Sequence, residues 1–347
     1  MSTAALQEPR ETEIIRFLAG IGWGRALRRA MGADWSSRRY ERLEMDGRRA
    51  ILMDAPGAAA AQVPPFVQIG GILSGLGLSA PVIYGADEPA GLLLLEDFGD
   101  ATYAAMLDGG AVPALPLYER ATDVLVALHR GFRDEGGLPL YDKGLFLEQV
   151  MLFADAYVPA AIGRPLGESD RRALADAWAA VLDDAFGVPD SLLLRDYHPG
   201  NLMHLEGRPG VASCGLLDYQ DAGIGPVSYD LLSLLEDARR DVDPTIQAAM
   251  VARYLDAFPA LDRAAFGRSY AVLGAVRHAR IVGRVAQLAE AQRAAGGSAR
   301  QLGFLPRVWG QLTAKLSDPA LAPVRAWVQT HLPPDGAIPQ ILGVSGR

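Results

Sequence analysis

The chain has 347 residues, of which 50% are hydrophobic and 21% are charged. This is the composition of a soluble globular protein, and the length leaves room for two packed lobes. The formal net charge of -8 argues against a nucleic-acid or anionic-membrane surface. The single cysteine, Cys214, excludes an intramolecular disulfide framework, favours a reducing compartment and suits a small buried core residue.

No targeting or membrane segment is expected. The first residues carry three glutamates without a basic and then an apolar region, so we predict no signal peptide. The apolar stretches are short or broken by Gly and Pro, so we predict no transmembrane helix. We therefore expect a cytoplasmic protein, monomeric, with no nucleic-acid or membrane partner.

The first hundred residues predict a β-rich half. Two strand-like runs meet at Asp46-Gly47, a dipeptide typical of hairpin turns. The wholly apolar run from Leu92 to Leu95 predicts a strand inside a sheet. The expected elements, in order, are a helix over 11–31 that breaks near 20–22, a hairpin over 36–56, a helix over 62–77, an extended piece over 81–84 and a strand over 92–95.

Beyond Gly99 the chain reads mainly helical, because apolar residues recur at helical spacing. The predicted helices cover 118–132, 145–158, 170–185, 228–240, 244–257 and 266–294. A strand-rich part followed by a helix-rich part indicates an α+β fold of two lobes, with a hinge near Glu96 to Gly99. We expect a small β-rich N-lobe over 1–97, which binds nucleotide, and a larger, mostly helical C-lobe over 98–347.

The most informative segment runs from Leu192 to Asp230. Asp196 follows an apolar run, Pro199-Gly200 forces a turn, and Asn201 comes five residues after Asp196. Asp218 follows a second short apolar run. An aspartate and an asparagine at this spacing, then a second aspartate, are typical of kinases. One acid would accept the proton of the attacking hydroxyl, and the other two side chains would hold magnesium.

These residues carry a family resemblance. The segment RDYHPGN…GLLDYQDAGIGPVSYDL resembles the corresponding motif of the aminoglycoside phosphotransferase and choline kinase-like superfamily. Together with SSRRYERL, LLLLEDFGD and GAVRHARIVGRV, it is similar to bacterial cell-wall recycling kinases that phosphorylate N-acetylmuramate and N-acetylglucosamine at the anomeric hydroxyl. The resemblance implies a protein-kinase-like fold that uses ATP and Mg²⁺. It implies Asp196 as catalytic base, Asn201 and Asp218 as magnesium ligands, and Asp230 as an acid that braces the loop.

The triplet Asp97-Phe98-Gly99 spells the metal-binding motif of protein kinases, yet it precedes the catalytic loop by about a hundred residues. In kinases the metal-binding aspartate follows that loop. We therefore predict that Glu96, Asp97 and Phe98 form the hinge whose backbone receives adenine.

Kinases usually carry a lysine on the third strand of the N-lobe that holds the ATP phosphates, and this lysine is missing here. From Ala50 through Ala86 the only charged residue is Asp54, so neither the lysine nor its glutamate partner is present there. Arginine can bind phosphate with two parallel hydrogen bonds. The cluster Arg38, Arg39 and Arg42 is therefore the candidate phosphate ligand, and a solvated basic strand face is the alternative.

The excess of positive charge near the end of the chain bears on the chemical class of the acceptor. From residue 268 onward there are ten arginines and lysines against three acids, which disfavours a polycationic aminoglycoside and favours a neutral or anionic sugar. Arg277, Arg280 and Arg284 share one helix face and either contact the substrate or face solvent. Three further residues are candidate contacts of the sugar: His198, Glu148 and Asp155. His198 equally suits a role in shaping the loop, and the two acids equally suit positions that face solvent.

The sequence thus predicts an ATP-dependent sugar 1-kinase acting on N-acetylmuramate, N-acetylglucosamine or both in peptidoglycan recycling. Two alternatives remain at this stage. One is a phosphotransferase for another small alcohol or an aminoglycoside. The other is a nucleotide-binding pseudokinase, which the missing lysine suggests and the intact Asp196, Asn201 and Asp218 oppose.

Overall fold

The computed structural model describes residues 3–32, 38–110, 112–294 and 300–342. The first two residues of the predicted hairpin, Ser36 and Ser37, lie outside these ranges. The chain divides into two compact units. Unit 1 comprises Met1–Gly131 and Pro199–Ala222, and unit 2 comprises Phe132–His198 and Gly223–Arg347. The units differ from the predicted lobes, since a later segment returns to unit 1, and the nucleotide-binding role of 1–97 stays a prediction.

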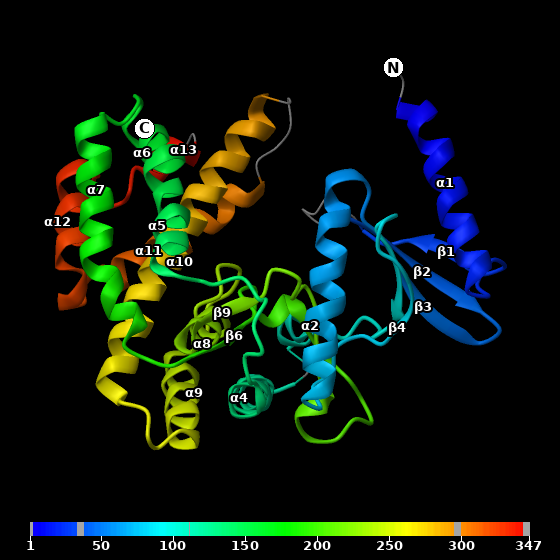
Figure 1. The fold of residues 1–347 in the computed structure, drawn as a ribbon. Coiled ribbons are helices and arrows are strands. Elements are labelled where there is room, and N and C mark those ends of the chain that lie inside the picture. The colour runs from blue at the N-terminus through cyan, green and yellow to red at the C-terminus, as the bar shows by residue number, and fades with distance from the viewer. Residues whose placement is uncertain (1–2, 33–37, 111, 295–299, 343–347) are drawn as a thin grey trace. The chain divides into compact units, whose positions relative to one another are not determined.

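Unit 1 is built on a five-stranded antiparallel sheet (Figure 1). Its strand order is β1-β2-β3-β5-β4, and a two-stranded pair, β7-β8, stands apart from it. The strands are β1 (Leu27–Ala30), β2 (Arg39–Met45), β3 (Arg48–Asp54), β4 (Ile83–Asp87), β5 (Leu92–Glu96), β7 (Leu202–His204) and β8 (Cys214–Leu216). The helices are α1 (Thr3–Gly20), α2 (Val63–Gly75), α3 (Tyr103–Asp108) and α4 (Ala114–Gly131).

The predicted hairpin forms as β2 and β3 over the described residues. Its turn is Asp46-Gly47, with φ values of 51° and 76°, and both lie in the left-handed region that this two-residue turn requires. Met45 pairs with Arg48 directly beside the turn. The predicted apolar strand is β5, which lies between β3 and β4, so its central position explains why Leu92 to Leu95 are all buried.

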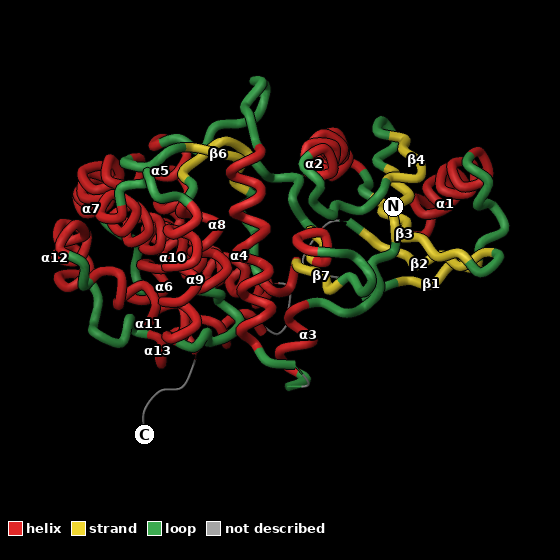
Figure 2. Tube along the Cα trace, turned by 90° about the horizontal axis from the view of Figure 1, so that it is seen from below, coloured by secondary structure: helices red, strands yellow, loops and turns green. Residues whose placement is uncertain are grey.

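Helix α1 covers one face of the sheet (Figure 2). Ile14 and Leu18 of α1 pack with Leu43 of β2 and with the alternate residues Ala50, Leu52, Leu92 and Leu94 of β3 and β5. The helix predicted over 11–31 is wrong beyond Gly20, because Leu27 to Ala30 form strand β1 instead. The chain reverses at Gly22, whose φ of 80° ends the helix without steric cost.

Helix α2 positions the segment after β8 within unit 1. Its Phe66 ring stacks on Tyr219 with centroids 4.6 Å apart. A Cβ on Gly70 would lie 2.8 Å from the Tyr219 hydroxyl, so glycine is required for this close approach. This packing fixes the backbone beside Asp218.

Unit 2 is mainly helical, with one two-stranded antiparallel pair, β6-β9. The strands are β6 (Asp190–Leu193) and β9 (Gly223–Pro226). The helices are α5 (Lys143–Leu152), α6 (Val158–Ile162), α7 (Glu168–Val181), α8 (Ser228–Leu235), α9 (Pro244–Ala257), α10 (Arg263–Ala294), α11 (Leu305–Leu316), α12 (Ala322–His331) and α13 (Ile338–Leu342). A π-helical segment, Phe153–Tyr157, joins α5 to α6.

The 32-residue helix α10 forms the centre of unit 2. It packs on α5, α8, α11 and the π-helical segment, and its buried face includes Val272, Val276 and Val282. A Cβ on Gly283 would lie 2.6 Å from the backbone of Leu152, so this glycine lets α10 approach the end of α5. The predicted helix over 266–294 is therefore confirmed, with its start three residues earlier.

The predicted helix over 228–240 is five residues too long. Helix α8 ends at Leu235, and Glu236 leaves the helical region with φ −123° and ψ 56°. The buried Glu236 side chain binds His278 and Lys315 instead, at 2.8 and 2.6 Å. Tertiary ion pairing therefore ends this helix, which periodicity alone does not reveal.

One stretch, Lys143–Ile162, is long and apolar enough to span a membrane by length and composition. A core helix of a soluble protein passes the same test. Several of its residues, including Phe146, Val150 and Tyr157, belong to the core of unit 2, which favours the core role.

Candidate active site

Asp196 lies in a loop of unit 2 that is held in an unusual backbone conformation. The loop follows β6, and Arg195 adopts φ 72°, which is uncommon for a residue with a side chain and is often found at functional sites. The Asp230 carboxylate accepts the backbone N–H groups of Leu194 at 2.6 Å and Arg195 at 2.9 Å. Asp230 therefore has the bracing contacts that its predicted role requires.

The two acids have opposite electrostatic surroundings. Burial would raise the pKa of Asp196, but the positive charges of Arg280, Arg195 and Arg277 outweigh it and lower this pKa. Burial raises the pKa of Asp230 to about 7, against the two backbone hydrogen bonds that favour its ionised form. Asp196 is therefore ionised at neutral pH and suited to accept a hydrogen bond from a hydroxyl.

His198 is buried two residues after Asp196, with 5% of its surface exposed. Burial, helped by the charge of Arg239, lowers its pKa to about 4. The imidazole is therefore neutral at physiological pH, which suits a structural part of the loop more than a proton carrier.

We expect His198→Gln to weaken the pH dependence of stability between pH 7 and pH 5. The unfolded imidazole binds a proton below its ordinary pKa of 6.5, whereas the folded one does not until about 4. The wild-type folded state therefore loses about 2 kcal/mol relative to the unfolded state over this window as the pH falls. Urea unfolding of both proteins at pH 7 and pH 5 measures the difference.

His331→Gln on α12 is the control for the loss of an imidazole. Equal pH dependence in wild type and His198→Gln would show that His198 does not resist protonation.

Two of the three predicted arginines of α10 lie beside this loop. Arg277 is 2% exposed and donates from Nη1 to the carbonyl of Glu236 at 3.3 Å. Arg280 is half-buried and donates to the Tyr229 hydroxyl at 3.4 Å. Both lower the pKa of Asp196. Arg284 is exposed and donates to Gln287 on its own helix.

Asn201 and Asp218 lie together in unit 1. The backbone N–H of Leu217 donates to the Asn201 carbonyl at 3.0 Å, and β7 pairs with β8 next to them. The Asn201 side-chain amide lies 3.5 Å from Asp218 Oδ2. Asp218 has φ 60°, a second residue in the left-handed region.

This pair fits a magnesium ion that is completed by phosphate. Mg²⁺ prefers oxygen ligands and is commonly held by one or two carboxylates together with substrate phosphates. Among the described residues no group of three or more His, Cys, Asp or Glu could hold a metal. An Asn–Asp pair is therefore compatible with a phosphate-dependent site and not with a preformed all-protein cage.

Arg38 is buried against the other side of Asp218. It donates to Asp218 Oδ1 at 2.5 Å and to Gln220 Oε1 at 2.9 Å, and Gln220 also donates to Asp218 Oδ1 at 3.1 Å. One carboxylate oxygen of Asp218 is thus held by these two residues, while Oδ2 lies on the Asn201 side. Gln220 was missed in the sequence, where only its place two residues after Asp218 marks it.

The other two arginines of the predicted cluster differ from Arg38. Arg42 forms an ion pair with Asp97 at 2.8 Å and another with Asp100 at 2.9 Å. Asp97 also accepts the backbone N–H of Gly99 at 2.9 Å. Arg42 and Asp97 therefore hold the turn after β5 together, and Arg39 is exposed.

The remaining hinge residues meet Arg208, which the sequence did not single out. Arg208 ion-pairs with Glu96 and lies over the Phe98 ring, 5.3 Å from its centroid. It also donates to the Ser79 hydroxyl at 2.9 Å. No pattern around Arg208 indicates these contacts, because its partners are more than a hundred residues away.

Glu148 and Asp155, the acidic candidates for sugar contact, are both exposed. Asp155 accepts from Arg171 at 2.6 and 3.0 Å. The structure gives these two side chains solvent-facing positions.

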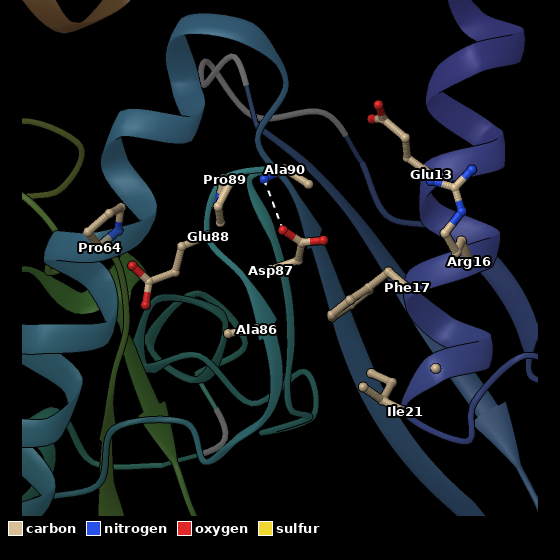
Figure 3. A pocket seen from close by; sticks show the side chains of 11 residues that line it. Glu13, Arg16, Phe17, Ile21, Pro64, Ala86, Asp87, Glu88, Pro89 and Ala90 are labelled. Atoms are coloured by element: carbon tan, nitrogen blue, oxygen red, sulfur yellow. Dashed lines mark hydrogen bonds between the residues drawn. The ribbon is translucent and has the colours of Figure 1, made fainter.

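An open pocket of about 1010 Å³ lies elsewhere in unit 1, between α1, α2 and the turn after β4 (Figure 3). Its lining includes Glu13, Asp87 and Glu88 but none of the predicted site residues. Three carboxylates against one arginine, Arg16, do not suit a phosphate ligand, and the candidate active site lies at the residues described above.

Family comparison agrees with this chemistry. The model of the phosphotransferase enzyme family matches residues 28–266, and the chain belongs to this family. It is 36% identical over 371 aligned residues to the N-acetylmuramate/N-acetylglucosamine kinase of Caulobacter vibrioides, with coverage of 94% of this chain and 98% of the relative. The predicted family is therefore confirmed.

Solved structures show the same fold at low sequence identity. A choline/ethanolamine kinase family protein from Mesorhizobium loti superposes with a TM-score of 0.60 at 13% identity, over 92% of this chain and 99% of that one. A streptomycin–ATP ternary complex of the phosphotransferase APH(2″)-IIa gives 0.55 at 12% identity, over 78% and 89%. The predicted protein-kinase-like α+β fold is confirmed.

Proposed function

We propose that this protein is an ATP-dependent sugar kinase that phosphorylates the anomeric hydroxyl of N-acetylmuramate, N-acetylglucosamine or both. The observation that carries the proposal is the Asp196 loop, in which an ionised aspartate stands on a strained backbone clamped by Asp230. The name of the Caulobacter relative supports the substrate class. The proposal includes a monomeric, cytoplasmic enzyme of peptidoglycan recycling.

In this mechanism Asp196 accepts the hydrogen bond of the anomeric hydroxyl and then its proton as the oxygen attacks the γ-phosphorus. The bond from the γ-phosphorus to the bridging oxygen of the β-phosphate breaks, and ADP leaves. The loop clamp keeps the carboxylate in position, which supplies much of the rate in phosphoryl transfer. His198 is buried and neutral at physiological pH, and we assign it to the structure of the loop. Four residues of chain separate Asp196 from Asn201, so one short loop connects the base to the metal ligands.

Asn201 and Asp218 would hold Mg²⁺ through oxygen atoms. The bound ion would offset the negative charge of the phosphates during transfer. Arg38 keeps Asp218 oriented through Oδ1 and adds a buried positive charge beside it, the role that we assign in place of the missing lysine. We keep Glu96, Asp97 and Phe98 as the adenine-binding hinge, with Arg42 as its brace. The exposed Arg39 stays a candidate contact of the nucleotide phosphates.

A sugar panel tests the proposal. Purified protein with ATP and Mg²⁺ should release ADP with N-acetylmuramate or N-acetylglucosamine, and ³¹P NMR should show a sugar 1-phosphate. Release should cease with EDTA. No ADP release with either sugar, alongside release with kanamycin or choline, would contradict the proposed substrate class.

The missing β3 lysine keeps a second function open to test, that of a nucleotide-binding pseudokinase. Such a protein would bind ADP or ATP in calorimetry yet release no ADP with any member of the panel. The ionised Asp196 favours the active kinase, because binding alone needs no base.

A further inference from the structure

Arg277 and Arg280 lie three residues apart on α10 and so share one face of the helix. Both contact α8, the helix that also holds the catalytic loop. Arg277 reaches the Glu236 carbonyl at the end of α8, and Arg280 reaches Tyr229 in its first turn. Asp230, next to Tyr229, holds the loop amides.

Both arginines keep an unsatisfied donor. Among the described residues, Nε of Arg277 and Nε of Arg280 are buried without a hydrogen-bond partner. Arg277 is 2% exposed, so its charge is almost wholly removed from water. Buried guanidinium groups are normally paired, because an uncompensated charge is costly. Arg280 is half-buried, with only its Nε shielded from water. These two unpaired donors beside one loop indicate an anion that is bound only in the working complex.

The carboxylate of the neighbouring Glu236 is paired with other cations. The Glu236 side chain binds His278 at 2.8 Å and Lys315 at 2.6 Å. A Cβ on Gly274 would lie 2.7 Å from Lys315 Cε, so this glycine makes room for the lysine stem. Because Glu236 is already paired with these two cations, its carboxylate does not satisfy Arg277, which reaches only its carbonyl.

The acceptor is the reactant that we assign to the same unit as the unpaired donors. The residues that we assign to the phosphates and their metal, Arg38, Asn201 and Asp218, all belong to unit 1. The two arginines belong to unit 2 together with Asp196, the base that meets the acceptor. The missing anion is therefore expected on the acceptor.

We propose that Arg277 and Arg280 form a carboxylate subsite for the acceptor and select sugar acids over neutral sugars. The inference rests on the proposed function and adds the substrate class within it. N-acetylmuramate carries a lactyl carboxylate that N-acetylglucosamine lacks, so the two sugars differ in the group that the subsite recognises. Arginine binds a carboxylate through two parallel hydrogen bonds, which fixes orientation as well as charge.

The test compares three acceptors at pH 8, where Asp196 stays ionised: N-acetylmuramate, its methyl ester and N-acetylglucosamine. Wild type should use the acid with a kcat/KM about tenfold or more above that for the ester. Arg280→Gln should lower kcat/KM for the acid by about 10- to 100-fold, mainly through KM. With the two neutral sugars Arg280→Gln should lose less kcat/KM than with the acid, so that the acid-to-ester ratio falls.

Arg268→Gln is the matched control, because it removes one arginine of the same helix that is exposed and pairs with Asp184. It should keep the acid-to-ester ratio of wild type. Arg280→Lys should restore part of the preference for the acid over the ester. Lysine keeps the positive charge but cannot bind a carboxylate through two parallel hydrogen bonds.

Equal losses for all three acceptors in Arg280→Gln would overturn the subsite, as would a wild-type enzyme indifferent to esterification. The ester comparison uses only wild type, so it decides the matter even if the variant fails to fold. A wild-type protein that phosphorylates neither sugar would instead refute the proposed function.

Discussion

Asp196→Asn should lower kcat by about 10²- to 10⁴-fold, the usual contribution of a general base, while ADP affinity changes little. The amide has nearly the shape of the carboxylate, but it cannot take the proton of the hydroxyl. It also removes a negative charge that lies beside Arg195, Arg277 and Arg280. Initial-rate kinetics with N-acetylmuramate gives kcat, and calorimetry with ADP and Mg²⁺ gives the nucleotide affinity.

Asp190→Asn is the matched control for this substitution. It lies at the start of β6, the strand that leads into the same loop, and it should retain the wild-type rate. A turnover in Asp196→Asn equal to that of the control would refute the assignment of the base.

Local chemistry made the central motif predictable. The run before Asp196 is apolar and Pro199-Gly200 follows it, so a strand and then a turn were predicted from residue types alone. The structure has β6 and a short turn there. The Asp46-Gly47 hairpin was equally predictable, because the left-handed conformation at both positions admits few residue pairs.

Long-range pairing explains what the sequence did not reveal. Strand β1 is short and exposed, and Arg28 joins it to Glu41 of β2 with hydrogen bonds of 2.6 and 3.0 Å. No apolar alternation marks such a strand, so helical propensity misled the prediction. Arg38 and Arg42 looked equivalent in the sequence, yet only Arg38 meets Asp218, about 180 residues away.

Helix α8 contacts the backbone of the Asp196 loop near its first turn and Arg277 at its end. Asp230 in its first turn holds the backbone before Asp196, while Ser233 donates to the Arg195 carbonyl at 3.4 Å. Glu236, the residue that follows its last turn, accepts from Arg277. One helix therefore connects the base loop to the proposed carboxylate subsite, so that an acceptor bound by its acid group would be placed with its hydroxyl near Asp196.

Asp218→Asn should lower kcat/KM by about 10²- to 10³-fold and raise the Mg²⁺ concentration for half-maximal activity by more than about tenfold. Asparagine tolerates the left-handed backbone at this position, φ 60°. Its carbonyl can still accept from Arg38 and Gln220, as Asp218 Oδ1 does. The change thus falls on the oxygen that faces Asn201, which becomes an amide nitrogen and repels a cation.

Asp46→Asn is the control, since it makes the same substitution at a left-handed position, φ 51°, in the β2–β3 turn. In a magnesium titration of the rate, the Asp46→Asn control should reach half-maximal activity at the wild-type Mg²⁺ concentration. Asp218→Asn should need a higher concentration. If both variants kept that midpoint, Asp218 would have no part in holding the ion. Because Asn201 alone offers one neutral oxygen, the metal site would then have to be sought outside the 201–218 segment.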